Sequence, residues 1–173
     1  MREEANRPND VEVRRWHNSD DIQAITNLLH RAYAPLAEQG FRYHATWQDA
    51  DVTLHRLTTG VPFIAHVDQA IVGTVTLYVP PSVSGCEWYN RGDVAYFGQF
   101  AVDPDLQGRG IGSRLLDAVE AEAIDRNIPN LGVDTAENAT QLIEMYEKRG
   151  FEFVGYADFE ITNYRSVVMN KVL

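Results

Sequence analysis

The chain has 173 residues, 45% of them hydrophobic and 23% charged, a composition typical of one globular domain and not of a disordered chain. Its 15 basic and 25 acidic residues give a net charge of −10, which argues against general nucleic-acid binding. Because no apolar run approaches about 18 residues and Cys86 is the only cysteine, we expect a cytoplasmic protein with no membrane partner and no intrachain disulfide.

The first third of the chain predicts a strand followed by helices. Residues 1–10 are polar and are expected to be a flexible N-terminus. Alternating apolar residues over 11–16 predict a strand. Asp20 and Gln23 then resemble a capping box, and apolar residues at helical spacing follow until Pro35, which is expected to end the helix.

The middle of the chain predicts a further helix and an antiparallel hairpin. The helix is expected near residues 47–57. The hairpin consists of the apolar segments 62–67 and 70–79, which are joined by a turn at 68–69. Residues 82–92 are expected to form a loop.

A long strand is predicted over residues 93–102, interrupted by Gly98. Glycine inside a strand often marks a bulge, so Gly98 is the expected position of one. A helix is predicted from Gly110, followed by a short apolar strand over 131–135.

The last third predicts one more helix and two closing strands. Asn138 is expected to cap the helix, with Gln141 at the capping-box position and Gly150 just beyond the helix end. The strands are expected near 151–161 and 165–172. The element order predicts a mixed α/β fold in a single domain spanning the whole chain, residues 1–173.

The turn between the strand ending at Val102 and the helix after it is rich in glycine. Free amides at a helix N-terminus bind phosphate groups, and glycine lets a ligand approach the backbone. The usual nucleoside-triphosphate loop is excluded because no lysine follows the last glycine. A dinucleotide site would use Asp134 for the ribose, but Ser113 stands where its third glycine is required, and too few residues follow Asp134 for a doubly wound domain.

Two blocks of the sequence resemble the GNAT superfamily of N-acetyltransferases. The family motif is Gln or Arg, two residues, Gly, one residue, then Gly or Ala, and residues 107–112 read Gln-Gly-Arg-Gly-Ile-Gly. The second block begins at Asn138, has Tyr146 eight residues later, and ends in Glu-Lys-Arg-Gly-Phe at 147–151. The resemblance implies a central mixed, largely antiparallel sheet of six or seven strands, flanked by about four helices and splayed between its fourth and fifth strands.

The resemblance also implies acetyl-CoA as co-substrate and a set of residues that bind it. The amides of the glycine-rich turn would hold the pyrophosphate, the backbone of the preceding strand would pair with the pantetheine arm, and two residues of the second block would complete the site. These residues are Gln107, Gly108, Arg109, Gly110, Ile111, Gly112 and Ser113 in the turn, Phe100, Ala101 and Val102 in the strand, and Asn138 and Tyr146 in the second block.

The implied reaction is direct attack of a neutral primary amine on the thioester in a ternary complex. Tyr146 is the expected general acid that protonates the leaving thiolate. Many relatives have a glutamate on the fourth strand as base, where this chain has only Gln99, which we expect to position a water molecule or the substrate. The base stays open among water and the side chains of Asp93, Glu87, Tyr96 and His44.

The acceptor is expected to be the amine of a small molecule or a peptide, surrounded by aromatic side chains after the first helix and in the last hairpin. These aromatics are Tyr33, Phe41, Tyr43, Trp47, Trp88 and Tyr164. The five histidines lack ligand spacing, so no metal is expected. A homodimer is implied by resemblance alone, and a non-catalytic acyl-CoA-binding regulatory domain is the alternative function.

Overall fold

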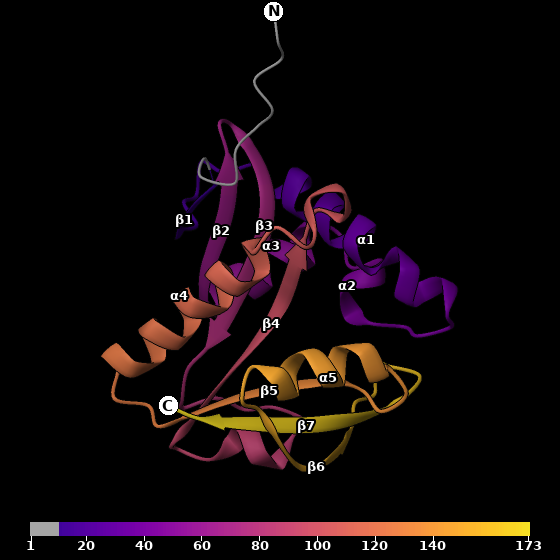
Figure 1. Cartoon of the computed structure of the whole chain (residues 1–173), viewed down its shortest axis with the longest axis vertical. Helices are drawn as coiled ribbons and strands as arrows, with labels where there is room; N and C mark the ends of the chain where they lie inside the picture. Colours follow the sequence, from indigo (N-terminus) through magenta and orange to yellow (C-terminus); the bar gives the residue numbers. More distant parts are fainter. Residues whose placement is uncertain (1–10) are drawn as a thin grey trace, which may run out of the picture.

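The computed structural model describes residues 11–173, so the expected flexible N-terminus at 1–10 lies outside the described residues. Seven strands form one sheet in the order β1-β2-β3-β4-β5-β7-β6 (Figure 1). All neighbouring strands are antiparallel except β4 and β5, which are parallel. The predicted mixed, largely antiparallel fold is confirmed.

The elements follow the predicted order closely. The strands are β1 (Val11–Arg15), β2 (Val61–Val67), β3 (Ala70–Tyr78), β4 (Val94–Val102), β5 (Asn130–Ala136), β6 (Glu152–Asp158) and β7 (Arg165–Val172). The helices are α1 (Ile22–Glu38), α2 (His44–Trp47), α3 (Ala50–Thr58), α4 (Ile111–Asp125) and α5 (Thr140–Lys148), with short 3-10 turns η2 (Glu87–Asn90) and η3 (Pro104–Leu106). None of the helices within residues 11–173 has the length and apolar character needed to cross a bilayer.

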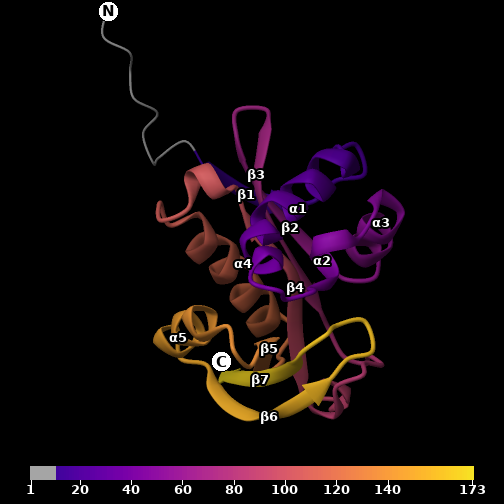
Figure 2. The ribbon, with the colours of Figure 1, turned by 90° about the vertical axis from the view of Figure 1, so that its right-hand side faces the viewer.

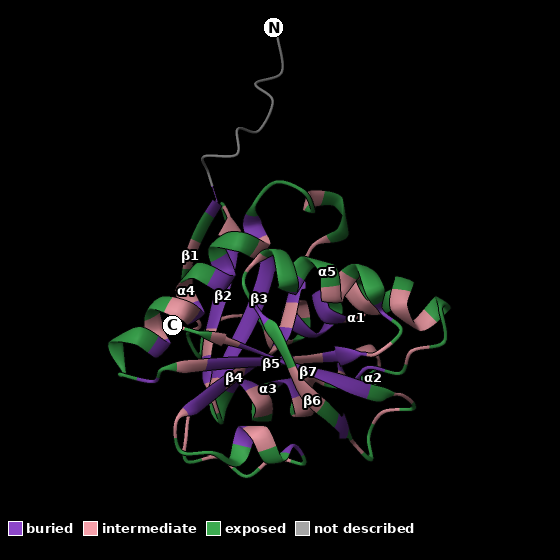
Figure 3. Ribbon diagram, turned by 60° about the horizontal axis from the view of Figure 1, so that its bottom comes forward, coloured by how far each residue is buried: buried purple, intermediate pink, exposed green. Residues whose placement is uncertain are grey.

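The helices cover both faces of the sheet (Figure 2). Helix α4 packs on one face, where Leu115 and Val119 join a core with side chains of β2, β3 and β4. Helices α1 and α3 lie on the other face, where Leu28 and Leu57 pack against Ile64 of β2. Burial follows this layering, since the inner strands are mostly buried, the edge strands β1 and β6 are more exposed, and the helices expose their outer sides (Figure 3).

Three predictions about the first helices were wrong. Pro35 does not end α1, which continues to Glu38, because Pro35 lies in the exposed last turn and its carbonyl still accepts a hydrogen bond from the Gln39 amide. Asp21, not Asp20, caps this helix by accepting from the Ala24 amide. The helix predicted over residues 47–57 is two helices, because Gln48 is extended between α2 and α3.

A bulge interrupts β4, but its residue is Gln99 and not the predicted Gly98. Thr74 pairs with Ala101 and Thr76 pairs with Gly98, so two residues of β4 lie opposite one residue of β3. Gln99 has a φ of 49°, a conformation that side chains other than glycine rarely adopt. A Cβ at Gly98 would instead press on the guanidinium of Arg56, because it would lie 3.1 Å from Nη2.

The expected splay between the fourth and fifth strands is confirmed. Strand β4 pairs with β5 only over Val94–Tyr96, opposite Asn130–Gly132. The remainder of β4 turns away from β5, which stays paired with β7 along its whole length (Figure 1). The backbone of β4 after Tyr96 is therefore unpaired on the side that faces β5.

Close packing of Tyr89 on Gly132 gives a test of this fold. A Cβ at Gly132 would lie 2.5 Å from Cε1 of Tyr89, which has almost no room to move because it is buried and stacked on Tyr96 at 4.2 Å. We expect Gly132→Ala to lower the free energy of unfolding in urea by about 1–3 kcal/mol, the usual cost of overpacking.

The matched control is Gly155→Ala in β6, where a Cβ would meet no atom within 4 Å. We expect that change to stay within about 0.5 kcal/mol of the unmodified chain. Equal effects of the two substitutions would contradict the packing of Tyr89 against β5.

Candidate active site

The glycine-rich turn lies between the end of β4 and the start of α4. Gly108 and Gly110 have φ values of 76° and 81°, in the left-handed region that favours glycine, and Gly110 is the N-cap residue of α4. No side chain caps α4, so the first amides of the helix are free, and the segment from Gln107 to Gly110 is exposed. Gln107 donates from Nε2 to the Val102 carbonyl at 3.3 Å, which holds the turn against β4. The turn therefore has the form of an anion site.

Arg149 ties the start of α4 to the end of α5. Its guanidinium donates to Oγ of Ser113 at 3.0 Å and pairs with Asp117 at 2.6 Å and Glu120 at 2.8 Å. The hydroxyl of Ser113 is thus fixed by a protein contact at the edge of the glycine-rich turn.

The end of β4 presents backbone to the gap beside β5. Val102 and Ala101 pair with Gly73 and Thr74 of β3 on the other side. The Phe100 carbonyl already accepts a hydrogen bond from the Tyr33 hydroxyl at 2.9 Å, so one of the expected pantetheine contacts has a protein partner.

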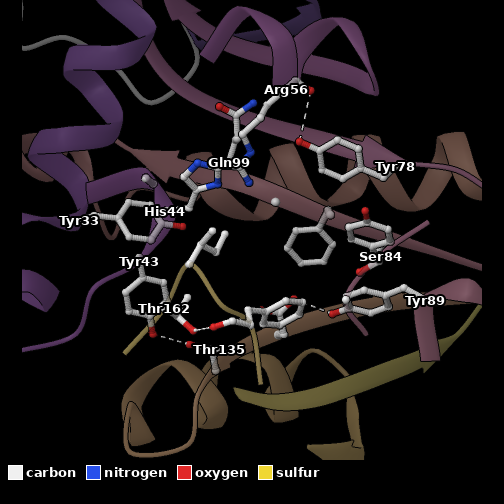
Figure 4. Close-up of a pocket in the computed structure, with 18 of the residues that line it drawn as sticks. Tyr33, Tyr43, His44, Arg56, Tyr78, Ser84, Tyr89, Gln99, Thr135 and Thr162 are labelled. Atoms are coloured by element: carbon white, nitrogen blue, oxygen red, sulfur yellow. Dashed lines mark hydrogen bonds between the residues drawn. The ribbon is translucent and has the colours of Figure 1, made fainter. Parts of the chain in front are cut away.

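A cavity of about 350 Å³ opens where β4 and β5 separate. Figure 4 shows Tyr33, Tyr43, Tyr78 and Tyr89 around it, together with Arg56 and Gln99. Tyrosines from almost every neighbouring element line this cavity, hereafter the tyrosine pocket: Tyr33, Tyr43, Tyr78, Tyr89, Tyr96, Tyr146 and Tyr164.

Tyr146 on α5 belongs to both the core and the tyrosine pocket. Its ring is 6% exposed and packs edge-on against Phe97 at 6.0 Å and Phe151 at 5.7 Å. Burial raises the pKa of Tyr146 well above 10, so the phenol keeps its proton at neutral pH. A protonated phenol that lines the pocket is what a general acid requires, and that role stays a prediction.

Asn138 does not cap α5 as predicted. The Ala139 amide donates to the Ala136 carbonyl, which forms a turn, and the helix begins only at Thr140 with Ala139 as its N-cap residue. The Asn138 side chain is exposed at the entrance to α5, with no hydrogen bond to any residue within 11–173. Its expected contact with the cofactor stays a prediction.

The side chain of Gln99 is part of a buried amide network. It is 2% exposed, and its Oε1 accepts from Nε2 of Gln48 at 2.8 Å. Oε1 of Gln48 accepts in turn from Nη1 of Arg56 at 2.6 Å, and Nε2 of Gln48 also donates to Thr53 at 2.8 Å. Gln99 therefore links the bulge of β4 to α3.

The structure separates the four side chains considered as the base. Tyr96 and His44 line the tyrosine pocket, whereas Glu87 is exposed outside it and Asp93 pairs with Arg91 at 2.8 Å. Burial lowers the pKa of His44 to about 4, helped by the positive charge of Arg56, so this imidazole is neutral at pH 7. Burial raises the pKa of Tyr96 to about 12.

Asp134 on β5 lines the pocket, although the sequence did not indicate it as a residue of an acetyltransferase site. Its Oδ2 accepts a hydrogen bond from the Tyr89 hydroxyl at 2.9 Å. Burial raises the pKa of Asp134 to about 6, opposed by the Tyr89 hydrogen bond and by the charge of Arg56. In the sequence, Asp134 stands out only as a single acid inside the short apolar strand 131–135. There it was considered as the ribose contact of a dinucleotide site.

Only some of the expected acceptor aromatics come together. Tyr33, Tyr43 and Tyr164 line the tyrosine pocket, and Phe41 packs behind them, 6.0 Å from Tyr164. Trp47 lies outside the pocket and is 41% exposed under Arg42. Trp88 packs near β7, where its indole donates to Asn170. No group of three or more His, Cys, Asp or Glu side chains within residues 11–173 is arranged to hold a metal ion.

Comparisons with known proteins agree with this geometry. Residues 22–151 match the model of the Acetyltransferase (GNAT) family. The S-(2-succino)cysteine N-acetyltransferase of Bacillus subtilis is 33% identical over 145 residues, covering 80% of this chain and 82% of that protein. An acetyltransferase of Pectobacterium atrosepticum is 32% identical over 143 residues, covering 81% and 87% of the two chains.

Solved structures show the same fold at lower identity. A GNAT family acetyltransferase from Elizabethkingia anophelis with acetyl-CoA bound superposes with a TM-score of 0.68 at 18% identity, covering 95% of this chain and 99% of the other. The ribosomal-protein-S18-alanine N-acetyltransferase of Escherichia coli gives a TM-score of 0.70 at 17% identity, covering 94% and 93%.

The raised pKa of Asp134 gives the protein a pH-dependent stability. Folded Asp134 keeps its proton up to about pH 6, whereas an unfolded aspartate releases it near about pH 3.9. The folded state binds more protons between these values, so this contribution is complete below about pH 4 and is lost as the pH rises through about 6.

We expect the free energy of unfolding of the wild-type protein, minus that of Asp134→Asn, to fall by up to about 3 kcal/mol between pH 4 and pH 7. Urea unfolding of both proteins across that pH range measures this difference. Asp51→Asn, at an exposed position of α3, is the control and should follow the wild-type curve. A constant difference between wild type and Asp134→Asn at all pH values would contradict a buried, proton-holding Asp134.

Proposed function

The chain belongs to the GNAT family of acetyltransferases, and we propose that it transfers the acetyl group of acetyl-CoA to a primary amine of a small molecule or peptide by direct attack in a ternary complex. The observation that carries this proposal is the separation of β4 from β5 beyond Tyr96. This separation leaves a gap with the glycine-rich turn at one end and the tyrosine pocket at the other. The alternative of a non-catalytic acyl-CoA-binding domain is not favoured, because the relatives are named acetyltransferases.

The donor would lie along the gap. The free amides at the start of α4, from Gln107 to Ser113, suit the pyrophosphate of acetyl-CoA, and the left-handed glycines keep side chains away from it. Strand β5 does not pair with β4 at Phe100, Ala101 and Val102, so backbone groups there would be available to the amide groups of the pantetheine arm, with the Phe100 carbonyl shared with the Tyr33 hydroxyl. Asn138 would complete the site from the entrance to α5.

The acetyl transfer itself needs two proton movements. The neutral amine attacks the thioester carbonyl, the new C–N bond forms, and the C–S bond breaks to release the coenzyme A thiolate. A backbone amide next to the β4 bulge would stabilise the oxyanion. Tyr146 would donate its phenolic proton to the thiolate, and water in the pocket would carry away the proton of the amine.

Gln99 would act as a positioning residue in this scheme. Its side chain is engaged with Gln48, so it has no free group with which to take a proton. It holds the bulge from which the neighbouring backbone faces the reacting carbonyl. A cytoplasmic location, a single domain over residues 1–173 and a homodimer all stay predictions.

Direct attack predicts a specific kinetic pattern. With acetyl-CoA and an amine varied together, reciprocal plots of thiol release should give intersecting lines, because both substrates must be bound before the acetyl group moves. Parallel lines would indicate an acetylated enzyme and contradict direct attack. If amino acids, polyamines, aminoglycosides and peptide N-termini all failed to give thiol release, the proposed acetyltransferase activity would be contradicted.

Removing the phenol of Tyr146 tests the general acid. We expect Tyr146→Phe to lower kcat by about 10²- to 10⁴-fold, the usual range for a general acid. Acetyl-CoA should still raise the melting temperature of the variant, which separates loss of chemistry from loss of binding.

Tyr156→Phe in β6 is the matched control, because Tyr156 is 54% exposed and outside the pocket, and it should keep its activity. Unchanged kcat in Tyr146→Phe would remove Tyr146 from the mechanism and leave the enzyme class intact.

A further inference from the structure

One guanidinium in the tyrosine pocket has no carboxylate partner. Arg56 is half-buried on α3 and is the only lysine or arginine among the lining residues within 11–173. Among residues 11–173 its side chain makes one hydrogen bond, from Nη1 to Oε1 of Gln48, and no salt bridge. The donors on Nη2 and Nε remain available.

The surroundings hold Arg56 in place and keep its charge directed at the pocket. Gln48 fixes Nη1, and the absence of a side chain at Gly98 makes room for Nη2. Its positive charge lowers the pKa values of Asp134, His44 and Tyr96, which lie on different sides of the cavity. A fixed cation that faces a cavity without a protein counter-ion is suited to bind an anionic group of a ligand.

Asp134 supplies the opposite charge in the same pocket. It is the only acidic side chain among the lining residues, and the Tyr89 hydroxyl occupies its Oδ2. Oδ1 accepts no hydrogen bond from the described residues and is free for an ammonium group. The pocket therefore offers one cationic and one anionic group to a ligand, with tyrosine rings between them.

We propose that the acceptor is a small primary amine that also carries a carboxylate, with Arg56 binding the carboxylate and Asp134 receiving the ammonium group. This inference rests on the proposed acetyltransferase function and assigns its substrate class. A cavity of about 350 Å³ has room for an amino acid or a small derivative. S-(2-succino)cysteine, for which the Bacillus relative is named, is an amino acid of this class and serves as the first probe.

The test compares acceptors that differ only in charge. S-(2-succino)cysteine is assayed against its triamide, and amino acids with a single carboxylate are assayed against their carboxamides; each amide keeps the amine and the shape but loses the negative charge. We expect the wild-type kcat/KM to favour the acids by at least about tenfold, because a charge-assisted hydrogen bond of this kind contributes roughly that much or more.

Two variants then separate the two contacts. Arg56→Gln should lower kcat/KM for the acids by about 10- to 100-fold, mainly through KM, and remove the preference over the amides. Arg56→Lys keeps the charge and should retain part of the preference. Asp134→Asn should lower kcat/KM for acids and amides by similar factors, since both carry the amine.

Arg91→Gln, an exposed arginine outside the pocket, is the control and should keep the wild-type preference. The assignment of Arg56 would be overturned if the wild type used acid and amide equally well, or if the preference for acids survived in Arg56→Gln. Thiol release with amines would in that case still support the acetyltransferase function. If no amine gave thiol release, the proposed acetyltransferase function itself would be overturned.

Discussion

The bulge at Gln99 is the constraint on which the rest of the site depends. An extra residue in β4 breaks its register with β3, and beyond Tyr96 the strand no longer pairs with β5. A continuous sheet would have closed this gap with ladder hydrogen bonds and left no room for a ligand arm. The bulge thus lies in the part of β4 that β5 leaves unpaired, beside the cavity that Gln99 lines. Its left-handed backbone at a non-glycine residue costs free energy, which the surrounding contacts must offset.

Those contacts form a chain of buried amides from β4 to α3. Gln99 is held by Gln48, and Gln48 is held by Arg56 and Thr53. An unpaired buried amide costs about 1–3 kcal/mol, so each member keeps the others in one arrangement. The same side chains that stabilise the strained backbone therefore also fix the guanidinium in the tyrosine pocket. The β4–β5 gap and the tyrosine pocket are linked through this one network, and a change in Gln48 would disturb both.

Local sequence patterns were enough for the fold and for the position of the glycine-rich turn. The glycines at 108, 110 and 112 and the order of helices and strands are encoded within short segments, and the structure has them as predicted. Errors arose where long-range contacts decide the outcome. Gly98 was chosen for the bulge on its conformational freedom, whereas its real constraint is the side chain of Arg56, 42 positions away in the sequence. Asp134 and Arg56 line one pocket only because β5 and α3 both border the gap, which no local pattern reveals.

A crystal structure with coenzyme A and an N-acetylated amino acid bound together would test the central claim most directly. The expected result has the pyrophosphate on the amides of residues 108–113, the pantetheine arm between β4 and β5 beyond Tyr96, the thiol near the hydroxyl of Tyr146, and the carboxylate of the product on Arg56. Coenzyme A bound outside the gap between β4 and β5, or a product whose carboxylate lies away from Arg56, would contradict it.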